Sequence, residues 1–423
     1  MRHRGRRVYY GWFVLAAVSG INFANNATAI GVLTVFIIPL TADFGWTRTQ
    51  ISAVTSVGAV LGALVAPFTG RLTDRLGARI PLILGGLCIV LATLNLAAMR
   101  SLEWFYLAFG LARLADQGCV QVSSPPAIAK WFQRYRGRAM AVLFFTTSAG
   151  GVALPPLVQL VITAWHWRMA WVMLSGIMLV IGLLPCALLV RRQPEDLGVP
   201  VDGEVPPAQE AMTLSSCGPE MPAARRTGEA PWPLREALKT AALWLLLASM
   251  FLFGVASTGV ALHLVPYLVQ QGIAPAAAVG AVSLSFLGSA AGNLMWGFCA
   301  DRLVVRYLLV ITYALRAASL ALLLVVDTTP VAYIFALLKG FTEGGLSTLI
   351  TVLLADYYGR EYLGEIYGVV RAVLVAGFAL GPLISGVTFD VAQSYHGAFA
   401  SFFALSIVGT GLIGLARRPL HGA

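Results

Sequence analysis

Long apolar runs recur along the whole chain, separated by short polar stretches. Each run has about 20 residues, enough for a helix to cross a bilayer core of about 30 Å. Twelve such runs begin near Gly11, Gln50, Ile80, Trp104, Ala139, Met169, Ala241, Ala276, Leu308, Val331, Gly364 and Gly397. Backbone polar groups in lipid must find partners within their own segment, and the shorter alternating segments of a β-barrel are not seen. The pattern therefore predicts an all-α, polytopic membrane protein with twelve transmembrane helices.

The residues that punctuate these runs return after a constant interval of 227 positions. The matching pairs are Pro39 and Pro266, Gly45 and Gly272, Gly70 and Gly297, Asp74 and Asp301, Arg75 and Arg302, Arg79 and Arg306, Gly137 and Gly364, Gly150 and Gly377, and Pro155 and Pro382. This repeat predicts two six-helix bundles, residues 1–190 and 239–423, with a substrate site between them near the membrane midplane. The stretch 191–238 is rich in proline and charge. It is expected to be a cytoplasmic linker with little fixed structure beyond a short amphipathic helix near 234–238.

The charge distribution orients the chain. The net charge is +10, but 22 of the 29 Lys and Arg fall in segments on one side of the membrane if the N-terminus is cytoplasmic. Only Arg48, Arg100 and Arg168 fall in the opposite loops. This bias predicts cytoplasmic termini and accounts for the positive charge without nucleic acid. The opening "MRHRGRR" is interpreted as a retained cytoplasmic anchor.

Other chemistry is not indicated by the sequence. The five cysteines and five histidines show no disulfide or metal spacing. The chain has no G-x-x-x-x-G-K-[ST] motif, so ATP-driven transport is not expected from it. A membrane-embedded enzyme would need a nucleophile–base or metal constellation, and none is visible. We therefore expect no enzyme, no cofactor and no metal.

Two motifs carry a family resemblance. The segment "GRLTDRLGAR", 70–79, resembles the G-x-x-x-D-R-x-G-x-R motif of the major facilitator superfamily. "GFCADRLVVR", 297–306, is a weaker copy with Val304 in place of the second glycine. The stretches "YYGWFVLAA", "DFGWTRTQIS", "RRQPEDLGVPVDG" and "YGVVRAVLVAGFALGP" are similar to the bacterial monocarboxylate and oxalate/formate branch. One departure is Tyr10, where monocarboxylate carriers usually have an acidic residue. The resemblance implies a monomeric transporter of the bacterial inner membrane.

The same motifs imply a gate. By the resemblance, residues of both copies bridge the two bundles when the cytoplasmic side is closed. The gating candidates are Gly70, Asp74, Arg75, Arg79, Gly297, Asp301, Arg302 and Arg306. A carboxylate at a helix end can accept hydrogen bonds from an arginine or from a neighbouring helix N-terminus, and glycine permits close approach. The alternative is that these charges are solvated loop residues that satisfy the positive-inside rule.

Charged residues inside the predicted helices are candidates for the transport site, because burying them is costly. In the fourth helix Arg113, Asp116 and Gln117 share one face, and in the tenth Lys339 and Glu343 are four residues apart. Asp116 and Glu343 are also repeat mates. One interpretation is two ion pairs that offset the cost of burial. The other is a relay in which a proton or an anion competes for the bases, with Asp116, Glu343 and Lys339 coupling the proton.

Arg371 is the strongest candidate for anion binding. It lies in the eleventh helix with no acid within four residues. A buried guanidinium needs a partner, and a substrate carboxylate would match its two-pronged geometry. Glu343 is the alternative partner, in a structural salt bridge. Arg316, in the ninth helix, is expected to pack against a neighbour or to snorkel.

Further substrate-binding candidates complete the predicted site. They are Asn22, Asn26, Asn293, Arg113, Gln117, His263, Tyr267 and Phe341. Each also has a structural alternative, either interhelical hydrogen bonding or packing. By the resemblance, Asn293 stands where monocarboxylate carriers often place a substrate-binding arginine, which weakens the case for a simple lactate-like substrate.

The sequence thus predicts a secondary active transporter of small organic anions, in the first place monocarboxylates. It would work by proton symport or anion exchange, with alternating access and with membrane lipid as its surroundings. A proton-coupled drug or metabolite exporter on the same fold is an alternative, because Asp116 and Glu343 lie in the membrane. A transporter-like substrate sensor, with the linker as its partner surface, is another.

Overall fold

The computed structural model describes residues 9–46, 48–203 and 232–419 of the chain. Within these residues, nine helical stretches are long and apolar enough to cross a membrane. They are Tyr10–Phe44, Arg79–Ala97, Arg136–Ala164, Trp167–Leu189, Ala241–Gln270, Val305–Leu324, Thr329–Tyr358, Leu363–Phe389 and His396–Leu415. Three further long stretches are Arg48–Leu76, Leu102–Trp131 and Pro275–Ala300. They bring the series to the twelve that the apolar pattern predicts, and the all-α fold is confirmed.

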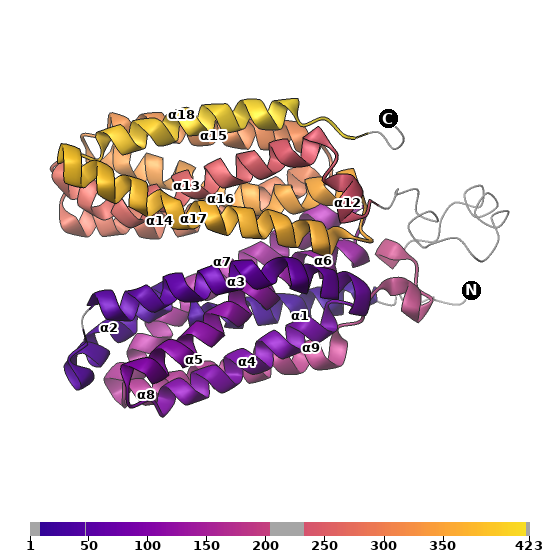
Figure 1. Ribbon diagram of the computed structural model, residues 1–423, viewed down its shortest axis with the longest axis horizontal. Coiled ribbons are helices and arrows are strands. Elements are labelled where there is room, and N and C mark those ends of the chain that lie inside the picture. The colour runs from indigo at the N-terminus through magenta and orange to yellow at the C-terminus, as the bar shows by residue number, and fades with distance from the viewer. Residues whose placement is uncertain (1–8, 47, 204–231, 420–423) are drawn as a thin grey trace, which may run out of the picture.

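The helices fall into two groups (Figure 1). The first comprises α1 (Tyr10–Ala24), α2 (Ile30–Phe44), α3 (Arg48–Leu76), α4 (Arg79–Ala97), α5 (Leu102–Ala115), α6 (Gln121–Trp131), α7 (Arg136–Ala164), α8 (Trp167–Ile177) and α9 (Leu184–Leu189). The second comprises α12 (Leu234–Ala237), α13 (Ala241–Gln270), α14 (Pro275–Ala300), α15 (Val305–Leu324), α16 (Thr329–Tyr358), α17 (Leu363–Ala392) and α18 (His396–Leu415). The short helix predicted near 234–238 is present as α12. Most of the predicted linker, 204–231, lies outside the described residues.

Two helices of the first group are interrupted at polar residues. Between α1 and α2 the chain forms a 3₁₀ turn, Asn25–Thr28. Between α5 and α6 it forms a π-helical turn, Asp116–Val120. Such turns change the direction in which side chains point and are frequent at functional sites. Both interruptions present polar side chains at the same depth in the bundle, as the contacts below show.

The apolar core shows how the two groups meet. One cluster includes residues of both groups, among them Trp131, Met140, Met250 and Tyr358. The other two clusters are each confined to one group, the first around Phe36, Phe105 and Trp171 and the second around Tyr267, Phe335 and Phe399. The shared cluster lies toward the end of the molecule where α1 begins and α18 ends, here called the terminus-side end (Figure 1). The groups are therefore packed together at this end and have separate cores at the other.

Candidate functional site

A polar cluster surrounds Asp116 inside the first group. Its Oδ2 accepts hydrogen bonds from Arg113 Nη1 at 2.7 Å and from Gln117 Nε2 at 2.8 Å. Its Oδ1 accepts one from Asn25 Nδ2 at 2.5 Å. Arg113 also donates to the backbone oxygen of Thr28 at 3.3 Å. The two interrupted helices therefore join through this carboxylate, and the charges of Asp116 and Arg113 compensate each other.

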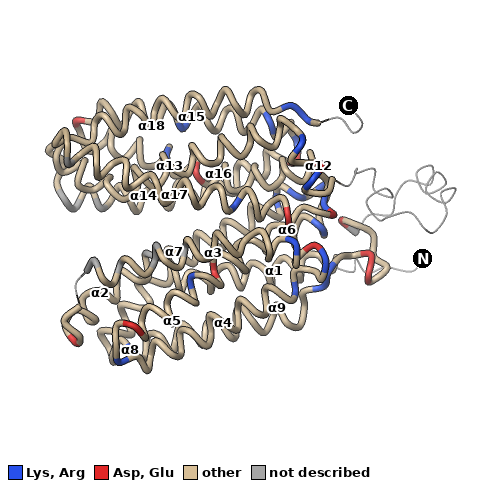
Figure 2. Tube along the Cα trace, viewed as in Figure 1, with Lys and Arg blue, Asp and Glu red and all other residues tan. Residues whose placement is uncertain are grey.

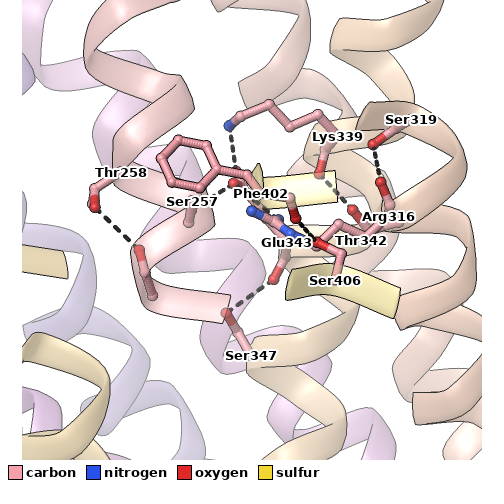
Figure 3. A network of polar contacts seen from close by, with 11 residues as sticks. Ser257, Thr258, Arg316, Ser319, Lys339, Thr342, Glu343, Ser347, Phe402 and Ser406 are labelled. Atoms are coloured by element: carbon pink, nitrogen blue, oxygen red, sulfur yellow. Dashed lines mark hydrogen bonds and ion pairs between the residues drawn. The ribbon is translucent and has the colours of Figure 1, made fainter. Parts of the chain in front are cut away.

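A second cluster surrounds Glu343 inside the second group (Figure 3). Lys339 Nζ lies 2.8 Å from Oε2, while Ser257 Oγ at 2.7 Å and Arg316 Nη1 at 3.4 Å contact Oε1. Arg316 is 2% exposed and its guanidinium lies 4.2 Å from the centre of the Phe253 ring. The expected packing of Arg316 thus includes an ion pair with Glu343 that the sequence analysis did not identify. One carboxylate here compensates two cations.

Arg371 links the two groups. Its Nη2 donates to Gln117 Oε1 at 2.9 Å, from α17 to the π-helical turn of the other group. Its Nε is buried and has no hydrogen-bond partner in the part of the chain that the structure describes. Glu343, the alternative partner, is bound to Lys339, Arg316 and Ser257 instead. The partner of this arginine is therefore a neutral amide.

The asparagine candidates make contacts between helices. Asn22 donates to Ser124 Oγ at 2.7 Å, and Asn26 donates to the backbone oxygen of Thr147 at 2.9 Å. Asn293 is 2% exposed and donates to Ser148 Oγ at 3.2 Å, which is a second polar contact between the two groups. The sequence analysis singled out Asn22 and Asn26, whereas the carboxylate of Asp116 is held by Asn25.

The remaining candidates lie within the second group. His263 Nε2 is 3.4 Å from the backbone oxygen of Pro382. Tyr267 is 1% exposed, and its hydroxyl donates to the backbone oxygen of Leu323 at 3.0 Å. The ring of Phe341 packs against Trp296 with centroids 5.4 Å apart. The contacts of His263 and Tyr267 bind α13 to its neighbours, which favours a structural role for both.

The two motif aspartates lie at the terminus-side end and make equivalent contacts. Asp74 accepts hydrogen bonds from the backbone nitrogens of Gly364 at 3.0 Å and Glu365 at 2.7 Å, at the start of α17. Asp301 accepts them from Gly137 at 2.7 Å and Arg138 at 3.3 Å, at the start of α7. Each carboxylate therefore occupies the positive N-terminus of a helix in the other group. The donors are themselves 227 residues apart, so the structure makes the same contact twice.

Glycines allow the helices of each contact to approach closely. A Cβ added at Gly70 would lie 2.1 Å from the backbone oxygen of Gly364. One at Gly297 would lie 2.5 Å from that of Gly137. No larger residue fits either place without moving a backbone.

The charges around the two contacts differ. Beside Asp74, Lys130 Nζ lies 3.2 Å from the carboxylate, and Arg71 pairs with Glu365 at 2.6 Å. By the 227-residue interval, Phe298 corresponds to Arg71 and Arg138 to Glu365. Arg138 lies 5.1 Å from the Phe298 ring and 3.1 Å from Asp301 Oδ2. Burial raises the pKa of the Asp301 carboxyl above its usual value, against the lowering effect of its backbone hydrogen bonds and of Arg138.

The other motif arginines stay within their own group in the described contacts. Arg75 is exposed, and Arg79 donates to the backbone oxygen of Ala187 at 2.6 Å. Arg302 lies 4.0 Å from the Phe298 ring, and Arg306 lies 3.4 Å from the Tyr307 hydroxyl oxygen. Among the gating candidates, the described contacts between the groups therefore come from the aspartates and glycines.

Two further arginines make contacts at this end, where Figure 2 shows many of the Lys and Arg residues gathered. The sequence analysis counted them only as part of the positive bias. Arg360 is buried and donates to the backbone oxygen of Lys130 at 2.8 Å and to Glu195. Arg136 pairs with Asp356 at 3.0 Å. Both connect the groups. The sequence could not predict the pairs Arg360–Glu195 and Arg136–Asp356, because their partners are 165 or more residues apart.

The model of the Major Facilitator Superfamily matches residues 13–282 and 265–422. The chain belongs to this superfamily. It is 26% identical over 414 residues to monocarboxylate transporter 13 of Rattus norvegicus, with 96% of this chain and 88% of the relative covered. It is 26% identical over 420 residues to monocarboxylate transporter 12-B of Danio rerio, with 94% and 85% covered. The predicted resemblance to the monocarboxylate branch is confirmed.

Solved structures of the superfamily share the fold. FucP in its outward conformation has a TM-score of 0.73 at 15% identity, covering 98% of this chain and 100% of that one. The human organic anion transporter MFSD10 has a TM-score of 0.72 at 17% identity, covering 95% and 99%. Superfamily membership identifies the chain as an integral membrane transporter of small molecules and not an enzyme.

Proposed function

We propose that this superfamily member transports a small organic anion, in the first place a monocarboxylate, and that Arg371 binds its carboxylate. The partner of Arg371 carries this proposal. Arg113 is compensated by Asp116, and Arg316 and Lys339 share Glu343, whereas among the described residues the hydrogen-bond partner of Arg371 is an amide and not a carboxylate. Burying an uncompensated guanidinium is costly, and a substrate carboxylate would offset that cost with a charge-assisted, two-pronged contact.

The surroundings of Arg371 support the same substrate class. The described helices hold four bases and two acids at their centres, namely Arg113, Arg316, Lys339, Arg371, Asp116 and Glu343. Two positive charges therefore remain without a carboxylate of their own. Asn293, from the second group, adds a neutral hydrogen-bonding side chain at the interface, where it donates to Ser148 Oγ of the first group.

We assign proton coupling to Glu343, with Lys339 and Asp116 as supporting groups and anion exchange as the alternative mode. Glu343 is held by two cations and a hydroxyl, and its side chain is 22% exposed. A rearrangement of either cation during transport would leave a carboxylate in the membrane that favours its protonated form. Asp116 is held more completely, by three donors, and its side chain is 4% exposed.

Alternating access would proceed by rocking of two bundles, 1–190 and 239–423, about this site. The shared core and the paired aspartate contacts close the terminus-side end, so access there requires them to separate. The charge bias of the sequence favours a cytoplasmic location for that end. The helix-11 stretch "YGVVRAVLVAGFALGP" favours a bacterial inner membrane, with lipid around a monomer.

Flux into proteoliposomes tests the proposal. We expect radiolabelled acetate, L-lactate or benzoate to be taken up, and an inward proton gradient to drive uptake if coupling is symport. Arg371→Gln should lower uptake at least about tenfold through lost charge-assisted bonds, whereas Arg100→Gln, an exposed arginine, should not. Absence of flux for every carboxylate would reject this substrate class and leave the exporter and sensor interpretations.

A further inference from the structure

Gln117 is the one side chain in the described structure that contacts both Arg371 and the Asp116 cluster. Its Oε1 accepts from Arg371 and its Nε2 donates to Asp116. The reversed amide would place its NH₂ against a guanidinium and its oxygen against a carboxylate, so the network fixes the orientation. Arg371 as the donor and Asp116 as the acceptor therefore hold the side chain of Gln117 at the interface.

The chemistry of an amide suits a temporary partner. Its oxygen is neutral, so its hydrogen bond to a guanidinium is weaker than that of a carboxylate. It also leaves the charge of Arg371 uncompensated. An incoming carboxylate would therefore displace the amide with a net gain. A glutamate at the same place would neutralise Arg371, although its second oxygen would face Asp116 in place of the amide donor.

The repeat shows that this amide belongs to one half only. Asp116 and Glu343 are repeat mates, but the residue after Glu343 is Gly344. A Cβ there would lie 2.2 Å from the backbone oxygen of Ser289. In the second group, close packing of α16 against α14 therefore leaves no room for a side chain at Gly344. In the first group, the equivalent position holds Gln117, which reaches across the interface.

We infer that Gln117 is a placeholder for the substrate carboxylate, which holds Arg371 in the empty transporter and is displaced when substrate binds. It is a positioning residue, which acts through Arg371. This inference rests on the proposed role of Arg371.

Binding of acetate, L-lactate and benzoate to the purified full-length protein tests the displacement. Gln117→Glu should weaken binding of each probe that the unaltered protein binds by about tenfold or more, because it forms a permanent ion pair with Arg371. Gln117→Leu removes the competing acceptor and should leave binding equal or tighter. Gln271→Glu makes the same change at an exposed position and should have no effect.

The pattern of results separates the two proposals. If Gln117→Leu and Gln117→Glu weaken binding equally while Arg371→Gln abolishes it, Gln117 is only structural or a direct ligand, and the placeholder is rejected with the role of Arg371 intact. If the unaltered protein binds none of the probes, the anion proposal fails and the displacement fails with it.

Thermal unfolding of the empty protein tests the contact without substrate. Arg371→Gln and Gln117→Leu should change the unfolding midpoint non-additively when combined, because residues in direct contact couple. Additive midpoints would show that Gln117 does not hold Arg371 in the empty transporter and would overturn the inference, whatever the protein transports.

Discussion

At the scale of single residues, the membrane interior tolerates charge because each charge has a specific neighbour. Glu343 receives three contacts from three different helices, α13, α15 and α16. Removing one member of such a group leaves the others uncompensated, which costs several times more than a surface pair contributes. The same reasoning makes Glu343 suitable for binding a proton. When one of its cations moves away, the protonated, neutral form of Glu343 keeps the shape of the side chain without an uncompensated charge.

Glu343→Gln should abolish uptake driven by a pH gradient while substrate binding and counterflow at equal pH persist. The amide preserves shape and part of the hydrogen bonding but cannot gain or lose a proton. Gradient-driven uptake with and without an ionophore measures this. Unchanged coupling in the variant would remove Glu343 from the proton path.

At the scale of elements, α7 and α17 each begin without a side-chain cap of their own. The first backbone N–H groups of a helix have no partner within it, and an acidic acceptor there typically contributes about 1 kcal/mol. In this protein the acceptors are Asp301 and Asp74, which come from the opposite group. The capping of one element is thus also the attachment between the two groups.

Asp74→Asn should accelerate amide hydrogen exchange at 364–365, and Asp301→Asn should do so at 137–138. A loss of about 1 kcal/mol of capping corresponds to roughly fivefold faster local opening. Hydrogen-exchange mass spectrometry resolves the two starts. Asp327→Asn, at an exposed loop position, provides the control. Equal exchange in all variants would show that these carboxylates do not hold the helix ends.

Glycine contacts within a group and between groups should respond differently to alanine. A Cβ at Gly340 would lie 1.8 Å from the backbone oxygen of Ser285, inside one bundle. Gly340→Ala should therefore lower the unfolding midpoint. Gly70→Ala presses on the opposite group and should open the terminus-side end with a smaller loss of stability.

Gly110→Ala is the control for both, since nothing lies within 4 Å of its added Cβ and alanine favours the helix. Thermal unfolding and the labelling of cysteines introduced at the terminus-side end report the two effects. Equal losses of stability in Gly70→Ala and Gly340→Ala would contradict the distinction.

At the scale of the whole molecule, the two groups are packed together at the terminus-side end, where they share an apolar core. Aspartate caps, glycine contacts and the Arg360 and Arg136 ion pairs all lie beside the shared core. Because many weak contacts must break together, we expect this end to open and close as a unit. Substrate shifts that equilibrium only by its difference in affinity for the two states.

A covalent connection at this end should stop transport without preventing binding from the other side. Arg71→Cys with Glu365→Cys, in a background without the native cysteines, places two thiols at positions whose long side chains now form an ion pair between the groups. A short bis-thiol reagent should abolish flux, and reductant should restore it. Single-cysteine variants treated in the same way provide the control. Flux that survives complete cross-linking would show that transport does not require this end to open.

The sequence by itself determined the membrane fold, the repeat and the location of the charges. Apolar length, glycine and proline spacing and an interval of 227 residues depend only on chain order, because lipid forces each span to satisfy its own backbone. The pairs Arg113–Asp116 and Lys339–Glu343 were also readable, since residues three or four apart on a helix share a face.

Only the tertiary structure decided which partners meet across helices. Arg371 contacts Gln117 and not Glu343, and Arg316 contacts Glu343. Of the three asparagines in this stretch, Asn25 binds Asp116, whereas Asn22 and Asn26 contact other residues. In the described contacts Arg79, Arg302 and Arg306 stay within their own group, while Asp74 and Asp301 reach the other. These choices depend on helix rotation, on the two interrupted helices and on which end is closed, and residue spacing along the chain specifies none of them.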